Sequence, residues 1–192
     1  MTKYNTLINI LDAILREAPT SMCHKYPIAN LSEERLNQAR SRAFIHLYLK
    51  VSFGLLDFEQ REHLLTDGAF DGGIDGYYIS KESKTIYLIQ SKFRTSTKNF
   101  EQKEIALDEI LSMDIDRILK GETLDDYGNQ YNGKILQLQR EINNLEDIAR
   151  YSYRVILLAN LNNINDNNLR KLTGGYFCDI FNFERCYKDL VF

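Results

Sequence analysis

The chain has few of the residues that mark disulfide-rich, zinc-binding or membrane proteins. Its three cysteines, Cys23, Cys178 and Cys186, are odd in number and lack metal-ligand spacing, so we expect reduced thiols rather than a disulfide framework. No apolar run approaches the ~18 residues of a membrane helix, and charges break the amphipathic amino-terminal pattern. These absences predict a soluble, cytoplasmic protein with no membrane partner.

The motifs of several large enzyme classes are missing as well. The sequence has no Walker lysine loop, no G-x-S-x-G elbow, no C-x-x-C pair, no H-E-x-x-H helix and no internal repeat. Its histidines, His24, His46 and His63, are scattered, and His46 falls within a predicted helix, where packing is the expected role. Nucleotide-loop, serine-hydrolase and zinc-protease chemistry are therefore not indicated.

The length and apolar content fit one domain. With 192 residues, of which 44% are hydrophobic, the chain can bury one core but is short for two, so we expect a single domain over residues 1–192. Residues 188–192 form an apolar tail without a stop signal. This tail favours an N-terminal fragment of a longer protein.

The charge balance is slightly acidic. A net charge of −3 argues against tight nonspecific binding to nucleic acid, because lysine and arginine supply phosphate contacts. A local basic run that could contact nucleic acid begins at Lys92 and continues with Arg94, Lys98 and Lys103. A run of this size is more often a solvated helix face.

Aspartate and glycine are concentrated in the stretch that follows the short acidic segment 57–62. Three aspartates recur at a spacing of four among four glycines: Asp67, Asp71 and Asp75. Two runs rich in aromatic and β-branched residues, 75–80 and 85–92, follow with a loop of hairpin length between them. We predict a β-hairpin fed by a glycine-rich loop.

The hairpin would bring three polar side chains together. Alternation along the second strand puts Gln90 and Lys92 on one face at its polar end, and Asp75 opens the strand beside it. Oxygen ligands hold a hard cation such as Mg²⁺, the cation activates water, and a lysine offsets charge on a phosphate. The alternative is an ordinary glycine-rich turn with solvated aspartates, which is the better interpretation for Asp67 alone.

These residues resemble those of a known nuclease family. Gly-Ile-Asp75-Gly followed by Ile-Gln90-Ser-Lys92 resembles the PD-(D/E)xK restriction-endonuclease-like nucleases, in the Mrr-like variant where Gln replaces the acidic residue. The longer string, residues 67–79 and 86–93, is more specifically similar to the amino-terminal region of abortive-infection phage-resistance (AIPR) proteins. Gln90 departs from the parent pattern because it is neutral, although it can still offer a carbonyl oxygen to a metal.

The resemblance implies an activity, a cofactor and a set of site residues. We expect a Mg²⁺-dependent (or Mn²⁺-dependent) endonuclease that hydrolyses phosphodiester bonds, with DNA as substrate, in phage defence or restriction. Asp75, Gln90 and Lys92 would be catalytic. The metal ligands would be Asp75, Gln90, the Ser91 carbonyl and Asp71, which is a secondary ligand or a loop-shaping residue.

A further acid and the partners follow from the same resemblance. In many restriction-endonuclease-like folds a first-helix acid reaches the metal, which makes Glu33 a candidate, although the dipole of a helix capped by Ser32 also explains it. Two cuts on a duplex need two sites, so we expect a homodimer. The rival interpretation is a nuclease-like module that no longer cuts and serves in nucleic-acid binding or oligomerisation; the acidic charge and the neutral Gln90 favour it.

Hydrophobic periodicity predicts the remaining elements. Helices are expected at residues 4–16, 33–51, 97–119, 134–150 and 167–172, and strands at 154–159 and 176–183. The run at 154–159 is continuously apolar, which is typical of a central strand buried on both faces. The order predicts an α/β fold with a restriction-endonuclease-like mixed sheet flanked by helices, whose core is one helix, three strands, a helix and a strand.

Overall fold

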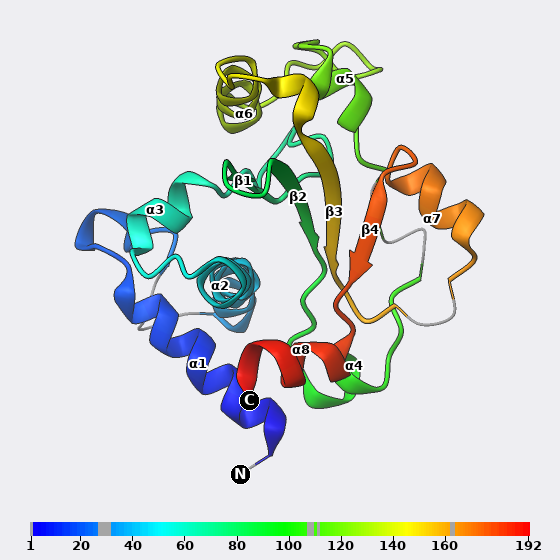
Figure 1. Ribbon diagram of the computed structural model, residues 1–192. Coiled ribbons are helices and arrows are strands. Elements are labelled where there is room, and N and C mark those ends of the chain that lie inside the picture. Colours follow the sequence, from blue (N-terminus) through cyan, green and yellow to red (C-terminus); the bar gives the residue numbers. More distant parts are fainter. Residues whose placement is uncertain (1, 27–31, 107–109, 111, 162–163) are drawn as a thin grey trace.

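A four-stranded mixed sheet forms the centre of the computed structural model, which describes residues 2–26, 32–106, 110, 112–161 and 164–192. The strands, in their order across the sheet, are β1 (Gly76–Ser80), β2 (Thr85–Ser91), β3 (Ser152–Leu158) and β4 (Phe177–Ile180). β1 and β2 are antiparallel, whereas β2, β3 and β4 run parallel. Helices lie on both faces of the sheet (Figure 1), so the predicted mixed α/β arrangement is confirmed.

The predicted hairpin is β1 and β2, joined by residues 81–84. The restriction-endonuclease-like core would have a further strand in front of it. In its place the structure has a single antiparallel bridge between Leu65 and Gly76, supported by a hydrogen bond from the Tyr77 N–H to the Leu64 carbonyl (3.0 Å). The chain therefore enters the sheet at Gly76, directly after Asp75.

Two long helices, both predicted from the sequence, lie on one face of the sheet, the second between the first and the strands (Figure 1). They are α1 (Lys3–Glu17) and α2 (Glu33–Phe53). The Ser32 hydroxyl accepts a hydrogen bond from the Arg35 N–H (3.4 Å), so the predicted cap is present. Within the described ranges, no helix is both long and apolar enough to cross a membrane.

The opposite face is covered by shorter helices: α5 (Ile115–Leu119), α6 (Gly133–Asn143) and α7 (Asp166–Leu172). The other short elements are η1 (Thr20–Met22), α3 (Phe58–His63), α4 (Thr97–Glu101), η3 (Ile148–Arg150), α8 (Phe183–Cys186) and a π-helical turn, η4 (Tyr187–Val191). Two hydrophobic cores result, one on each face of the sheet.

Strand β3 separates the two cores, as its apolar sequence predicts. Val155 and Leu157 pack into the core under α5 and α6, while Ile156 and Leu158 pack into the core under α1 and α2. All four side chains are at most 2% exposed. This burial explains why the strand has no alternation of apolar and polar residues.

One predicted helix is wrong. Instead of a continuous helix over 97–119, the chain forms α4 and α5, and the described residues between them, 102–106, 110 and 112–114, are not helical; Leu107 and Leu111, expected on that helix, lie outside the described residues. The intervening main chain bonds elsewhere: the Ile105 N–H donates to the Asn160 carbonyl and the Met113 N–H to the Leu172 carbonyl, both at 3.0 Å. Tertiary hydrogen bonds thus override the helical apolar pattern.

Two other predicted elements are shorter than expected. The helix over 134–150 ends at Asn143, and Asp147 then adopts a left-handed conformation (φ 57°) before η3. The strand over 176–183 is reduced to Phe177–Ile180, because Asn182 caps α8 through a hydrogen bond from the Arg185 N–H (3.0 Å). Such end shifts leave the fold unchanged.

A buried arginine joins α1, α2 and α3, and no sequence pattern predicted it. Arg61 is fully buried although it lies in the segment that reads as a short acidic stretch. Its guanidinium donates to the carbonyls of Leu55 and Leu56, both at 2.7 Å, and to the Glu17 carboxylate. A buried cation needs such partners, so this arrangement ties the end of α1 to the turn before α3.

The neighbouring Glu62 is the anionic centre of the same network. It accepts hydrogen bonds from the Tyr26 hydroxyl and from the Lys25 ammonium (3.0 Å), and it lies 3.3 Å from His46 Nε2. His46 is also fully buried and stacks on Phe58, so its predicted packing role is confirmed. Burial by itself raises the pKa of Glu62, but the bonds from His46, Tyr26 and Lys25 outweigh burial and lower the pKa to about 2.

This pKa predicts how acid weakens the fold. Because folding lowers the pKa of Glu62 from 4.5, its contribution to stability is complete above that value and is lost as the pH falls toward 2. Glu62→Gln should reduce the free energy of unfolding near neutral pH by about 3 kcal/mol, and by much less near about pH 3. Urea denaturation across this pH range measures the difference.

The same substitution at Glu82, in the exposed hairpin turn, is the matched control. Glu82→Gln should change the free energy of unfolding by less than ~0.5 kcal/mol at every pH. A deficit in Glu62→Gln that stays constant with pH would contradict the assigned ionisation.

Candidate functional site

The hairpin register sets the position of Asp75. Gly76 pairs with Ile89, and the Asp75 N–H donates to the Ile89 carbonyl (2.8 Å), so Asp75 lies beside Gln90 at the carboxyl end of β2. Its carboxylate also accepts a hydrogen bond from the Ser91 N–H (2.6 Å). Both bonds join the first residue before β1 to the last residues of β2.

Three aspartates meet at this point. One carboxylate oxygen from each of Asp67, Asp71 and Asp75 lies within 4.8 Å of the other two, a spacing that can hold a metal ion. Asp67 is exposed, while Asp71 and Asp75 are more enclosed. Hard cations such as Mg²⁺ prefer carboxylate oxygens, and the cluster offers three.

Asp71 shapes the loop that carries the cluster. Its two oxygens accept hydrogen bonds from the N–H groups of Gly68 (3.1 Å) and Gly73 (2.9 Å), which close the loop on itself. Burial raises the pKa of Asp71, and these two N–H groups partly offset the rise. The loop-shaping role considered for Asp71 is therefore present in the structure.

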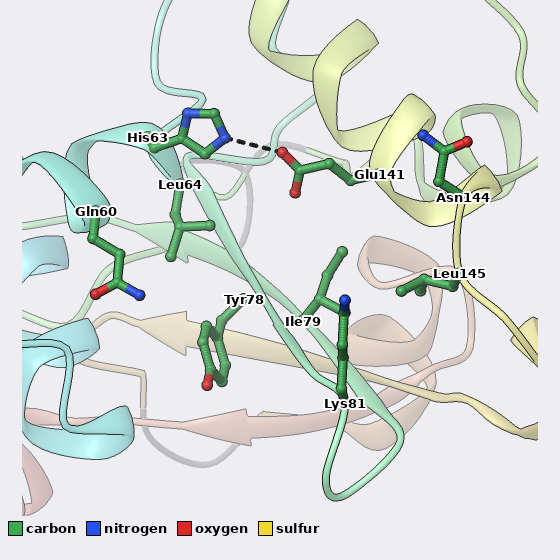
Figure 2. Close-up of a pocket in the computed structure, with 9 residues that line it drawn as sticks. All are labelled: Gln60, His63, Leu64, Tyr78, Ile79, Lys81, Glu141, Asn144 and Leu145. Carbon is green, nitrogen blue, oxygen red and sulfur yellow. Dashed lines mark hydrogen bonds and ion pairs between the residues drawn. The ribbon is translucent and has the colours of Figure 1, made fainter.

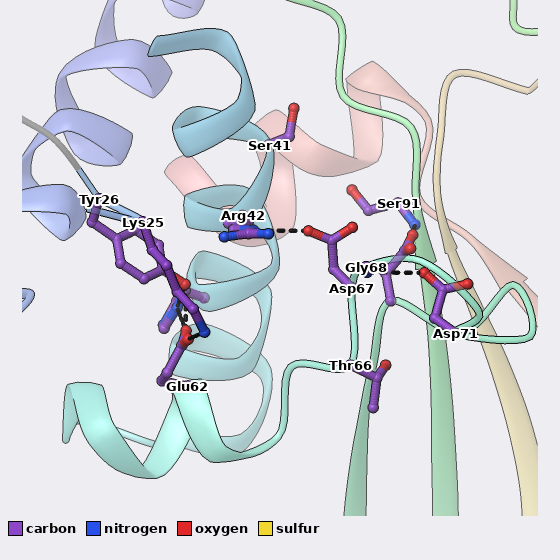
Figure 3. Close-up of polar contacts among 12 residues, drawn as sticks. Lys25, Tyr26, Ser41, Arg42, Glu62, Thr66, Asp67, Gly68, Asp71 and Ser91 are labelled. Atoms are coloured by element: carbon purple, nitrogen blue, oxygen red, sulfur yellow. Dashed lines mark hydrogen bonds and ion pairs between the residues drawn. The ribbon is translucent and has the colours of Figure 1, made fainter. Parts of the chain in front are cut away.

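An arginine from α2 faces the cluster, and sequence reasoning missed it. Arg42 Nε donates to Asp67 Oδ2 at 2.8 Å, and Figure 3 shows the guanidinium reaching across from α2 to the loop. Glu33 does not join the cluster: it is exposed in the first turn of the same helix, roughly 13 Å before Arg42 at 1.5 Å per residue. From α2, a cation rather than an acid approaches the aspartates.

The surroundings of the Asp75 carboxyl group disfavour its ionised, negatively charged form. Burial raises its pKa, the Ser91 N–H offsets part of the rise, and the charges of Asp71 and Asp67 raise the pKa further, to about 7. Lys92 acts in the opposite sense and lowers it. A bound divalent cation would favour the ionised form, as Lys92 does.

Gln90 lies beneath the loop. It is 1% exposed, and its Nε2 donates to the Gly73 carbonyl at 2.8 Å. Gly73 has φ 74°, and a Cβ there would approach the Ser112 carbonyl oxygen to 2.7 Å, so the loop packs closely over Gln90. The amide thus supports the main chain between Asp71 and Asp75.

Ser91 and Lys92 lie where β2 meets β3. The Ser91 hydroxyl is buried and has no hydrogen-bond partner among the described residues. The Lys92 N–H donates to the Leu158 carbonyl (3.0 Å), and the Lys92 side chain lines a cavity of about 10 Å³ together with Arg94 and Asn160. None of the three aspartates lines this cavity.

The three residues predicted to contact nucleic acid follow Lys92 along the chain. Arg94 is half-buried, and its carbonyl accepts a hydrogen bond from the Tyr4 hydroxyl (3.4 Å). Lys98, in α4, and Lys103, just after it, are exposed. They lie on the segment that leaves the site rather than around the three carboxylates.

A larger hollow lies away from the aspartates. It has a volume of about 580 Å³ and is bordered by β1, α3 and α6 (Figure 2). His63 and Glu141 face each other across it at 3.0 Å, and Lys81 lies on the hairpin side. None of the three aspartates lines this hollow, so it is separate from the candidate site.

Comparisons of the chain with protein-family models, with curated proteins and with solved structures found no match. The chemistry proposed for this chain consequently rests on its own residues and their geometry.

The raised pKa of Asp75 predicts an unusual pH dependence of stability. Because folding raises this pKa from 3.8 to about 7, the contribution of Asp75 is complete at acid pH and is lost as the pH rises toward 7. Asn at this position can still accept the Ser91 N–H bond. In metal-free buffer Asp75→Asn should melt at a higher temperature than wild type near about pH 8, and at a similar temperature near about pH 4.

Divalent cations should reverse the order of the melting temperatures of wild type and Asp75→Asn. Mg²⁺ or Mn²⁺ that binds the ionised cluster stabilises only the folded chain, so it should raise the melting temperature of wild type and not that of Asp75→Asn. Thermal denaturation with and without the cation measures both effects. An equal cation effect on the two proteins would remove Asp75 from the ligand set.

Proposed function

We propose that this protein is a metal-dependent nuclease that hydrolyses phosphodiester bonds. The observation that carries the proposal is the convergence of three carboxylates at the open end of the hairpin. The positive charge of Lys92 lowers the pKa of Asp75. Carboxylates, a cation they can hold and a nearby amine are the groups that phosphodiester hydrolysis needs.

The aspartates would hold the cofactor, Mg²⁺ or Mn²⁺. Such a cation supplies an activated water and neutralises charge on the phosphate, and it needs only one or two carboxylates from the protein. Asp75 is the principal ligand because burial and its acidic neighbours leave its charge the least compensated. Asp67 and Asp71 add the negative charge that a neutral Gln90 lacks.

The other residues have distinct roles in this proposal. Lys92 orients the attacking water and offsets charge on the phosphate. Gln90 holds the Gly73 carbonyl and so fixes the loop from below. Ser91 contributes its main chain: its N–H fixes the Asp75 carboxylate, and its carbonyl is a further candidate ligand.

The order of elements supports the finer family assignment as part of the same proposal. A helix, an antiparallel hairpin, further helices and a strand parallel to the second hairpin strand fit part of the core expected for a PD-(D/E)xK nuclease of the AIPR-like type, with the bridge between Leu65 and Gly76 where that core has a further strand. With that assignment we propose DNA as substrate, phage defence or restriction as the setting, a cytoplasmic location, and a homodimer if both strands of a duplex are cut.

A second candidate function is a nuclease-like module that binds nucleic acid or oligomerises without cutting. The ion pair between Arg42 and Asp67 favours it, because the guanidinium already neutralises one carboxylate of the cluster. The net charge of −3 favours it as well. This candidate predicts salt-dependent binding without cleavage.

Cleavage assays distinguish the two candidates. Wild type should cut plasmid or single-stranded DNA with Mg²⁺ or Mn²⁺, and Asp75→Ala and Lys92→Ala should each reduce the rate by about 100-fold or more, because each removes a group that acts on the reacting phosphate. Gel electrophoresis of the products follows the rate.

Glu82→Ala, in the exposed hairpin turn, is the control and should cut at the wild-type rate. Melting curves of every variant establish that it is folded. Full activity in either Asp75→Ala or Lys92→Ala would remove the proposed site, and binding without cleavage by wild type would favour the inactive module.

A further inference from the structure

An exposed aromatic side chain stands at the tip of the aspartate loop. Phe70 lies between Asp67 and Asp71, and its side chain is 53% exposed. It belongs to neither hydrophobic core among the described residues. Its backbone is left-handed, with φ 59°, a conformation that residues with a Cβ rarely adopt.

The surrounding main chain fixes this conformation without help from the ring. The Phe70 carbonyl accepts a hydrogen bond from the Asn132 N–H (3.0 Å), and Asn132 Nδ2 donates to the carbonyls of Ala69 (3.3 Å) and Thr66 (2.9 Å). On the other side, Asp71 holds the Gly68 N–H. These bonds would be equally available to a residue with a small side chain.

A phenyl ring is therefore costly for the fold at this position. Gly72 and Gly73, in the same loop, adopt similar angles of 62° and 74° as glycines, which carry no steric penalty there. Phe70 combines the penalty of a left-handed residue with an apolar surface left in water. Strain of this kind persists where it serves function.

We propose that Phe70 stacks on an unpaired base of the nucleic-acid substrate, beside the phosphate that the aspartate cluster engages. This inference rests on the proposed function and names its substrate class: single-stranded nucleic acid, or a strand with a base turned out of the duplex. Phe70 directly precedes Asp71, whose carboxylate belongs to the cluster, so a base stacked on the ring would be bound by the same loop.

The net charge of the chain favours stacking on a base over contacts with phosphates. With a net charge of −3, phosphate contacts alone give little affinity, whereas an aromatic face binds any base. Bases inside a duplex already stack on their neighbours, so only an unpaired base can cover the ring. An exposed phenyl group on a main chain that hydrogen bonds already hold in place meets this requirement.

Fluorescence anisotropy with two probes tests the inference. The probes are a labelled single-stranded DNA of about 12 nucleotides and the matching duplex, in buffer with Ca²⁺, a cation that takes the same oxygen ligands, in place of Mg²⁺. Wild type should prefer the single strand. Phe70→Asn should weaken that binding by about ten-fold or more, because it removes one base stack.

Two further measurements separate stacking from folding. Asn tolerates the left-handed conformation, so Phe70→Asn should melt at the wild-type temperature or above it while losing affinity. Phe70→Trp should retain affinity, because indole also stacks on bases. The matched control is Phe177→Asn, which removes an aromatic that is 61% exposed on β4, at the other edge of the sheet, and should leave binding unchanged.

The outcomes are distinct for the two proposals. Equal binding by wild type and Phe70→Asn, a parallel loss in Phe177→Asn, a preference for duplex, or no binding of either probe by wild type would overturn the role of Phe70. Intact single-strand binding that depends on Phe70, together with no cleavage in Mg²⁺ or Mn²⁺, would reject the nuclease reaction and leave the stacking role standing.

Discussion

Two hydrogen bonds join Asp75 to β2, one through its N–H to Ile89 and one through its carboxylate from Ser91, and the candidate site depends on both. They fix the register of the hairpin at the point where the loop enters the sheet. A slip of one residue would turn each side chain of β1 to the other face and would move Tyr77, which is now fully buried, out of the core under α5 and α6. The core under α5 and α6 thus enforces the position of the acid.

The candidate site brings three carboxylates together, and the fold compensates their negative charges unequally. Asp71 accepts hydrogen bonds from two main-chain N–H groups, and Asp67 is paired with Arg42. The negative charge of Asp75 is the least compensated of the three, which raises its pKa. A second polar centre, around Arg61 and Glu62, is built differently, because each of these two charges is paired and buried. The helix α2 serves both: Arg42 faces the loop, and His46, one turn later, lies in the buried network.

Local patterns predicted the parts of this fold whose apolar spacing or capping residues lie within one short run of the sequence. The hairpin, the first two helices and β3 follow from apolar periodicity, the Ser32 cap and a continuous apolar run. The helix over 97–119 failed because its middle section bonds to Asn160 and Leu172, partners that no local pattern reveals.

The same distinction applies to the site. The spacing of the aspartates and the alternation in β2 predicted that Asp75 would lie beside Gln90, and the structure has that arrangement. Arg42 could not be found, because nothing on its helix distinguishes an arginine that reaches a loop many residues later. The sequence around Arg61 indicates only an acidic stretch, because the burial of Arg61 against α1 is a property of the tertiary fold. Phe70 carried no signal, because its backbone angle is invisible in the sequence.

The tight fit of the glycines has a consequence for how the protein tolerates change. Gly72 faces Ile118 and Gly73 faces the Ser112 carbonyl, at distances of 2.9 and 2.7 Å from where a Cβ would stand. The aspartate loop is therefore in direct contact with α5 and the segment leading into it, on the far side of the sheet from α2. Substitutions that loosen that segment would displace the aspartates before they unfold the chain, so sequence changes around α5 should alter the geometry of the aspartate cluster as readily as changes in the loop itself.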